Sequence, residues 1–173
     1  MKIAIFYSSV DGQTRKISNS IKDHLCSKCI VDLYSIDSCT QEELSQYNFI
    51  VVGASIRYGR YRKNLFKFIN NNLEMLNSKK SAFFCVNIVA RKDDKNRPST
   101  NPYIKKFLRS SPWSPTFLDV FAGKLDYPKY NFFNKNIIRL IMYITKGPTN
   151  ISMAYEFTDW HKVHLFSKKI LSS

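Results

Sequence analysis

The chain has 173 residues, the size of one domain with its own hydrophobic core, so disulfide staples are not needed for stability. Its 27 Lys and Arg against 13 Asp and Glu give a formal net charge of +14, which predicts an anionic partner: nucleic acid, an anionic membrane surface or a phosphate- or carboxylate-bearing ligand. The opening MKIAIFYSS turns polar too early for a secretory signal, so we expect a cytoplasmic protein whose four cysteines are reduced.

Apolar runs alternate with segments whose apolar residues recur at helical spacing. In chain order the first half predicts a strand at 2–7, a helix at 14–25, a strand at 30–34, a helix at 41–47 and a strand at 49–54. The second half predicts a helix at 65–76, a strand at 81–89, a helix at 103–108, a strand at 117–122 and a helix at 160–171. This alternation indicates an α/β fold with a parallel sheet covered on both faces.

The connection after the fifth strand is unusually long. Residues 124–150, named here the insertion, stand where such a connection needs only a few residues. Residues 137–144 are nearly all apolar and too few to span a bilayer, and they are surrounded by lysine, arginine and aromatic residues. This combination predicts a helix lying at a membrane interface. The alternative is a helix packed on the sheet edge with solvated basic residues.

The first strand runs directly into SSVDGQT, at the start of a helix. Ligands of parallel sheets bind beyond the carboxyl ends of the strands, and a phosphate there would accept hydrogen bonds from helix amides. Ser9 and Thr14 add hydroxyl groups, and Gly12 lets the backbone approach closely. Neither the P-loop pattern nor the dinucleotide fingerprint is present, so the loop predicts a mononucleotide phosphate.

Residues 54–61 and 87–92 follow the third and fourth strands and would reach the same edge of the sheet. Both segments offer backbone amides and small residues where a ring system would lie. Tyr58 would either stack on a planar ligand or close the end of the sheet.

Several stretches in order resemble one family: DGQTRKI (11–17), VVGASIRYGRY (51–61), SAFFCVNIVARK (81–92), KFLRSSPWSP (106–115), AGKLDYPKY (122–130) and FTDW (157–160). The N-terminal half resembles flavodoxin-like FMN proteins, and the whole set resembles the bacterial quinone-dependent protoporphyrinogen oxidases. The resemblance implies one domain over residues 1–173, a flavodoxin-like three-layer α/β/α sandwich. Its five-stranded parallel sheet would have the order 2-1-3-4-5, with the insertion at the fifth strand.

The same resemblance implies a function. The protein would use FMN in the six-electron oxidation of protoporphyrinogen IX to protoporphyrin IX for haem synthesis. Electrons would pass to menaquinone or ubiquinone at the cytoplasmic face of the bacterial inner membrane, where family members are peripheral proteins. Because the flavin supplies the chemistry, we expect no catalytic side chain and no metal.

The resemblance also assigns site residues. FMN contacts are expected on three loops. The first loop contributes Ser9, Val10, Asp11, Gly12, Gln13 and Thr14, and the second loop contributes Ser55, Ile56, Arg57, Tyr58 and Gly59. The third loop contributes Phe84, Val86, Asn87, Ile88 and Ala90. Cations for the two propionates of the substrate, or for lipid headgroups, are expected at Arg60, Arg62, Arg91, Lys92, Lys129 and Arg139.

Other interpretations are less well supported. An electron-carrying flavodoxin or an NAD(P)H-dependent quinone reductase is the first alternative, but electron-carrying flavodoxins are typically acidic. The second alternative is a nucleic-acid-binding module, but the sequence lacks the usual motifs of such modules, so we expect no nucleic acid.

Cys26 and Cys29 form a C-x-x-C spacing at a helix end rather than a helix start, which disfavours a redox or zinc role. His24, His161 and His164 are expected to be solvated helix residues. The sequence leaves the preferred quinone and the oligomeric state open.

Overall fold

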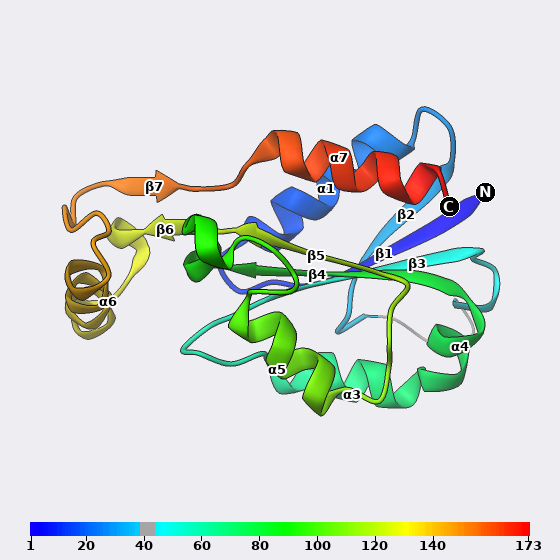
Figure 1. Cartoon of the computed structure of the whole chain (residues 1–173), viewed down its shortest axis with the longest axis horizontal. Helices are drawn as coiled ribbons and strands as arrows, with labels where there is room; N and C mark the ends of the chain where they lie inside the picture. The colour runs from blue at the N-terminus through cyan, green and yellow to red at the C-terminus, as the bar shows by residue number, and fades with distance from the viewer. Residues whose placement is uncertain (39–43) are drawn as a thin grey trace.

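The computed structural model describes residues 1–38 and 44–173. Five parallel strands form one sheet in the order β2-β1-β3-β4-β5, which confirms the predicted order (Figure 1). The strands are β1 (Lys2–Ser8), β2 (Ile30–Ser35), β3 (Phe49–Ser55), β4 (Lys80–Asn87) and β5 (Phe117–Ala122). All carboxyl ends therefore meet at one edge of the sheet.

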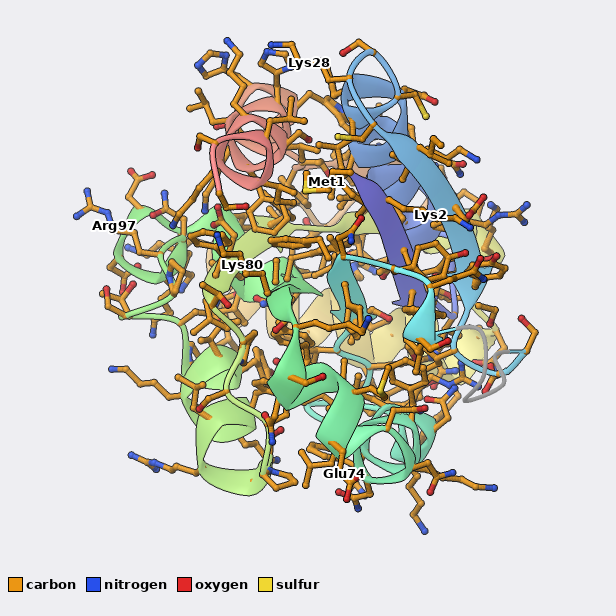
Figure 2. The ribbon with its side chains drawn as sticks, turned by 90° about the vertical axis from the view of Figure 1, so that its right-hand side faces the viewer. Met1, Lys2, Lys28, Glu74, Lys80 and Arg97 are labelled. Carbon is orange, nitrogen blue, oxygen red and sulfur yellow. The ribbon has the colours of Figure 1, made fainter. Side chains whose placement is uncertain are left out.

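Helices cover both faces of the sheet, as Figure 2 shows in a view along the strands from the end where Lys2 and Lys80 lie. One face carries α1 (Gln13–Leu25) and α7 (Trp160–Leu171). The other carries α3 (Lys63–Asn71), α4 (Leu73–Ser78) and α5 (Pro102–Ser110). The predicted three-layer sandwich is thus confirmed.

Alternation along the strands builds two hydrophobic cores. Successive side chains of a strand point to opposite faces, so Ile3 and Ile5 pack toward α1 and α7, and Ala4 and Phe6 pack toward α3 and α5. All four side chains are fully buried. A strand covered on both faces must be apolar throughout, which is the pattern that marked these strands in the sequence.

The structure corrects two predicted elements. The helix predicted at 65–76 is two helices, because the backbone leaves helical geometry at Asn72 (φ −122°), whose Nδ2 donates to the Phe68 carbonyl at 2.8 Å. The strand predicted at 81–89 ends at Asn87, whose Oδ1 accepts from the Ala90 amide at 2.9 Å and so begins the 3₁₀ helix Ile88–Arg91. A second 3₁₀ helix follows at Asp93–Lys95. The helix predicted at 41–47 lies in part outside the described residues.

The insertion forms a separate arm at the end of the molecule to which the strands point, opposite both termini (Figure 1). It contains β6 (Lys124–Asp126), the 3₁₀ helix Tyr127–Lys129 and α6 (Phe132–Ile144). The sequence predicted neither β6 nor a second short strand, β7 (Ala154–Glu156); the two pair antiparallel and are named here the ribbon. Leu125, Tyr127 and Met142 form a third, small core within the arm.

Candidate functional site

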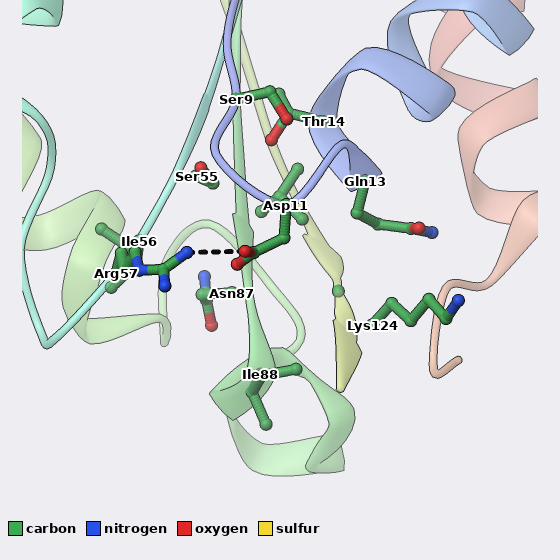
Figure 3. A pocket seen from close by; sticks show the side chains of 12 residues that line it. Ser9, Asp11, Gln13, Thr14, Ser55, Ile56, Arg57, Asn87, Ile88 and Lys124 are labelled. Carbon is green, nitrogen blue, oxygen red and sulfur yellow. Dashed lines mark hydrogen bonds and ion pairs between the residues drawn. The ribbon is translucent and has the colours of Figure 1, made fainter. Parts of the chain in front are cut away.

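A cleft lies at the carboxyl ends of the central strands, where ligands of parallel sheets bind (Figure 3). The cleft is open to solvent, and its empty space of about 380 Å³ includes part of that solvent. Its lining comes from Ser9, Asp11, Gln13, Thr14, Ser55, Ile56, Arg57, Val86, Asn87, Ile88, Gly123 and Lys124. The three predicted loops therefore do converge on one cleft.

The first loop presents unpaired hydrogen-bonding groups to this cleft. Gly12, with φ +88°, is the N-cap residue directly before α1, and its amide donates to Ser9 Oγ at 3.1 Å. The first helical hydrogen bond joins the Lys16 amide to the Gly12 carbonyl and no side chain caps the helix, so the amides of Gln13 and Thr14 have no helical acceptor. These amides and the helix dipole favour an anion here.

Thr14 provides a second, independent sign of a ligand. Its side chain is fully buried, and its Oγ1 has no hydrogen-bond partner among the described residues. A buried polar atom left unpaired costs about 1–3 kcal/mol, which a ligand oxygen would recover. The donors of the first loop therefore fit a phosphate group.

An ion pair crosses the cleft from the second loop to the first. Arg57 Nη1 lies 2.6 Å from Asp11 Oδ1, and Figure 3 shows the two side chains facing each other. Partial burial acts to lower the pKa of Arg57, but its contacts with Tyr58 and Asp11 act in the opposite direction and the net shift is upward. Arg57 thus carries a permanent positive charge against the first loop.

A tight turn holds Arg57 in place. Arg57 and Arg60 exchange backbone hydrogen bonds at 3.0 and 3.2 Å across Tyr58 (φ +49°) and Gly59 (φ +73°). Two successive positive φ values are typical of a type I′ turn, and a tyrosine there is uncommon. Tyr58 is 62 % exposed, so its ring is not buried at the end of the sheet.

The third loop is held by a buried amide. Asn87 lines the cleft and donates to Cys85 Sγ at 3.3 Å and to Asn101 Oδ1 at 3.4 Å. Phe84, by contrast, is fully buried on the α7 side of the sheet, packed against Phe121 and Phe166. The loop therefore reaches the cleft through Val86, Asn87 and Ile88.

Most of the predicted FMN residues line the cleft. Those that do not are Val10, Gly12, Tyr58, Gly59, Phe84 and Ala90. Sequence reasoning missed Gly123 and Lys124, which follow β5 and also line the cleft. The rule that ligands bind beyond strand ends, applied to the fifth strand, would have found both.

The six predicted basic contacts do not share one environment. Arg62 pairs with Asp37 at 3.6 Å, and Lys129 pairs with Asp126 at 3.5 Å. Arg91 donates to Thr145 Oγ1 at 2.8 Å and so binds the end of α6 to the third loop. Arg60, Lys92 and Arg139 form no ion pair within the part of the chain that the structure describes, and Arg60 lines a separate groove between α3 and α5.

Unlike an ordinary surface helix, α6 exposes most of its apolar side chains to solvent. Met142 and, partly, Ile138 pack into the small core of the arm, so α6 rests on the ribbon rather than on the edge of the main sheet. The apolar face of α6 points to solvent and consists of Phe132, Phe133, Ile137, Leu140, Ile141, Tyr143 and Ile144. Monomeric soluble proteins rarely expose such a continuous apolar patch.

The C-x-x-C pair and His24 lie near the end of α1. Cys26 and Cys29 are free thiols at the end of α1, and His24 lies against His164 on α7 with ring centroids 4.2 Å apart. Within residues 1–38 and 44–173, no group of three or more potential ligands is placed to hold a metal. In the same residues, no helix has both the length and the apolar character needed to cross a bilayer.

Comparison with known proteins adds three findings. A family model described as a flavodoxin domain matches residues 4–152. Protoporphyrinogen IX dehydrogenase (quinone) of Escherichia coli K12 is 39 % identical over 98 % of this chain and 94 % of its own, and that of Leishmania major is 39 % identical over 96 % and 73 %. Among solved structures, oxidised flavodoxin 1 from Bacillus cereus superposes with a TM-score of 0.54 at 14 % identity, covering 99 % of this chain and 98 % of its own.

Proposed function

The chain belongs to the flavodoxin domain family and, within it, to the protoporphyrinogen IX dehydrogenases (quinone), and on this premise we propose that it oxidises protoporphyrinogen IX to protoporphyrin IX in haem synthesis and passes the electrons to a quinone. The observation that carries this proposal is the 39 % identity to the Escherichia coli protein across 98 % of the chain. The cleft at the strand ends supplies a site for the flavin that such a reaction needs.

The flavin is FMN in this proposal, because the first loop offers donors suited to a phosphate. The amides of Gln13 and Thr14, the Thr14 hydroxyl and Ser9 would hold the phosphate, and Ser55, Ile56 and Asn87 would border the ring system. A bound FMN would supply the two-electron redox chemistry between the porphyrinogen and the quinone. The protein's own residues bind and orient, and no side-chain nucleophile is required.

The arm would bring this site to a membrane. The apolar face of α6 points outward, Lys135 and Arg139 lie on the same helix and Lys146 follows it, and the chain carries a net charge of +14. An amphipathic helix with flanking cations suits an anionic lipid surface, and a lipid-soluble quinone such as menaquinone or ubiquinone would be met there. We therefore place the protein at the cytoplasmic face of the bacterial inner membrane, as a peripheral protein.

An anaerobic cycle tests the reaction. The chain is reconstituted with FMN, protoporphyrinogen IX is added, and flavin absorbance and porphyrin fluorescence are followed before and after addition of a menaquinone analogue. We expect bleaching by the porphyrinogen and recovery with the quinone. A flavin that stays oxidised with the porphyrinogen, but is reduced by NADPH alone, would contradict this function and favour an NAD(P)H-dependent quinone reductase.

A sedimentation assay tests the membrane contact. Vesicles of phosphatidylethanolamine and phosphatidylglycerol are mixed with the wild type and with the double variant Phe133→Ser, Leu140→Ser, which removes exposed apolar groups from α6. The double variant should stay in the supernatant. Leu165→Ser is the matched control, because Leu165 is similarly exposed but lies on α7. Equal sedimentation of the double variant and the wild type would rule out α6 as the contact.

A further inference from the structure

The first loop contains a carboxylate beside the groups that would bind a phosphate. Asp11 directly precedes Gly12, the N-cap residue of α1, and it lines the same cleft as Thr14. A phosphate monoester carries a charge of about −1.5 to −2 at neutral pH. Like charges a few ångströms apart repel each other, so an isolated Asp11 would oppose binding of the phosphate.

Arg57 is the cation that faces this carboxylate. The Nη1 to Oδ1 distance is 2.6 Å, and the Arg57 and Asp11 side chains are 30 % and 44 % exposed, so solvent screens the pair only in part. The other nearby cations have different partners: Lys124, which also lines the cleft, pairs with Asp126 at 3.0 Å, and Lys16 on α1 pairs with Glu156 at 2.9 Å. Within the described residues, Arg57 is therefore the ion-pair partner of Asp11.

The turn from Arg57 to Arg60 fixes the position of this charge. Its two backbone hydrogen bonds and its two positive φ values hold Arg57 on the side of the cleft opposite the first loop. The guanidinium also lies 5.2 Å from the ring centroid of Tyr58, a cation–π contact. Arg57 reaches Asp11 from a preorganised turn, 46 residues away along the chain.

We propose that Arg57 is a specificity-determining residue that neutralises Asp11 and thereby allows the first loop to accept a phosphate, so that FMN is selected over riboflavin. This inference rests on the proposed flavin cofactor. Riboflavin has the same ring system without the phosphate, so its affinity does not depend on the charge of the first loop. Arg57 acts on the phosphate through Asp11 and is in this sense a positioning residue.

The charges of Asp11 and Arg57 predict a different FMN affinity for each of three variants. Arg57→Gln leaves the Asp11 carboxylate uncompensated and should weaken FMN binding by about tenfold or more, with riboflavin affinity changed less than about twofold. Asp11→Asn, which frees Arg57 to attract the phosphate, should bind FMN at least as tightly as the wild type. The double variant Asp11→Asn, Arg57→Gln removes both charges and should recover most of the lost FMN affinity.

Titration of the full-length apoprotein with FMN and with riboflavin, followed by quenching of flavin fluorescence, measures both affinities. Lys124→Gln is the matched control, since it removes a cleft cation that pairs with Asp126 instead, and it should weaken FMN binding less than Arg57→Gln does. An equal loss of FMN and riboflavin affinity in Arg57→Gln, or a double variant no better than Arg57→Gln, would overturn the inference. Failure of the wild type to bind either flavin would instead contradict the cofactor proposal itself.

Discussion

Gly12 combines a backbone conformation that favours glycine with a position beside the proposed phosphate site. Its φ of +88° is accessible to glycine but costs an L-residue about 1–2 kcal/mol, and a β-branched residue more. A Cβ at this position would meet nothing within 4 Å, so a side chain there would occupy open space rather than clash with the protein. That open space lies at the start of α1, where the phosphate is proposed to bind.

Gly12→Val should therefore lose FMN during purification, because the substitution distorts the first loop and fills the space before the α1 amides. Flavin content per chain, measured by absorbance after purification, checks this. Thermal unfolding of both apoproteins serves as the control for folding. A variant that retains as much FMN as the wild type would remove the phosphate assignment from the first loop.

Gly53 illustrates a purely structural constraint at the same scale. A Cβ on Gly53 would stand 2.1 Å from the ring of Phe84, which is fully buried and packs against Phe121 and Phe166. Gly53→Ala should lower the free energy of unfolding by about 1–3 kcal/mol, the usual cost of overpacking a core. Urea unfolding measures this, and adding Phe84→Leu, which shortens the opposing side chain, should restore part of the loss. No rescue would mean that the cost lies in the backbone rather than in the contact.

At the scale of elements, the ribbon and α6 are tied to two of the segments that form the cleft. Glu156 of β7 accepts hydrogen bonds from Lys16 at 2.9 Å and from Gln13 at 3.2 Å, both on α1. Arg91, just beyond the third loop, binds Thr145 at the end of α6. These polar contacts, together with the packing of Ile88 against the small core of the arm, position the ribbon and α6 relative to the cleft.

The contact between Glu156 and α1 should depend on pH. Burial acts to raise the pKa of Glu156, but the hydrogen bonds from Lys16 and Gln13 outweigh it and the pKa is lowered. A carboxyl group with a lowered folded pKa stabilises the fold above its unfolded value of about 4.3, and this stabilisation is lost as the pH falls through the lower folded value. The hydrogen bond from Lys124 lowers the pKa of Asp126 in the ribbon as well, so acid weakens both contacts in the same direction.

A pH titration followed by two-dimensional NMR checks this expectation. The amide signals of β7 should shift with a midpoint below about 4.3, while those of β1 in the main core should stay in place over the same range. Glu156→Gln removes one of the two titrating groups and should reduce the transition in β7, leaving the part that Asp126 of the paired strand causes. A transition that persists unchanged in Glu156→Gln would show that another group controls the ribbon.

At the scale of the whole molecule, the arm and the α/β sandwich have separate cores. The small core of Leu125, Tyr127 and Met142 is distinct from the two cores that flank the main sheet. Replacing residues 127–146 by a short glycine-serine linker should therefore leave a folded protein that still binds FMN. It should fail to oxidise protoporphyrinogen with a quinone presented in vesicles, because the apolar face of α6 is gone.

Circular dichroism, flavin titration and the vesicle assay together test this expectation. Full quinone-linked activity in the deletion variant would show that the arm has only a structural role. Loss of flavin binding would show that residues 127–146 support the cleft, which Lys124, just before the replaced segment, lines.

The local pattern of the sequence was sufficient for the main architecture. A strand buried on both faces must be apolar throughout, and a helix must repeat its apolar residues every turn, so the order of strands and helices in the sandwich could be predicted. The first loop could be located in the same way, because glycine, hydroxyl residues and a helix start follow one strand directly.

Only the tertiary structure decided the pairings between distant residues. The ion pair between Asp11 and Arg57 joins residues 46 positions apart, and β7 is a three-residue strand defined by its partner β6. The burial of Phe84 and the outward orientation of the apolar face of α6 likewise depend on which neighbours are present. Periodicity is a property of adjacent residues, whereas these contacts arise when separate elements meet in space.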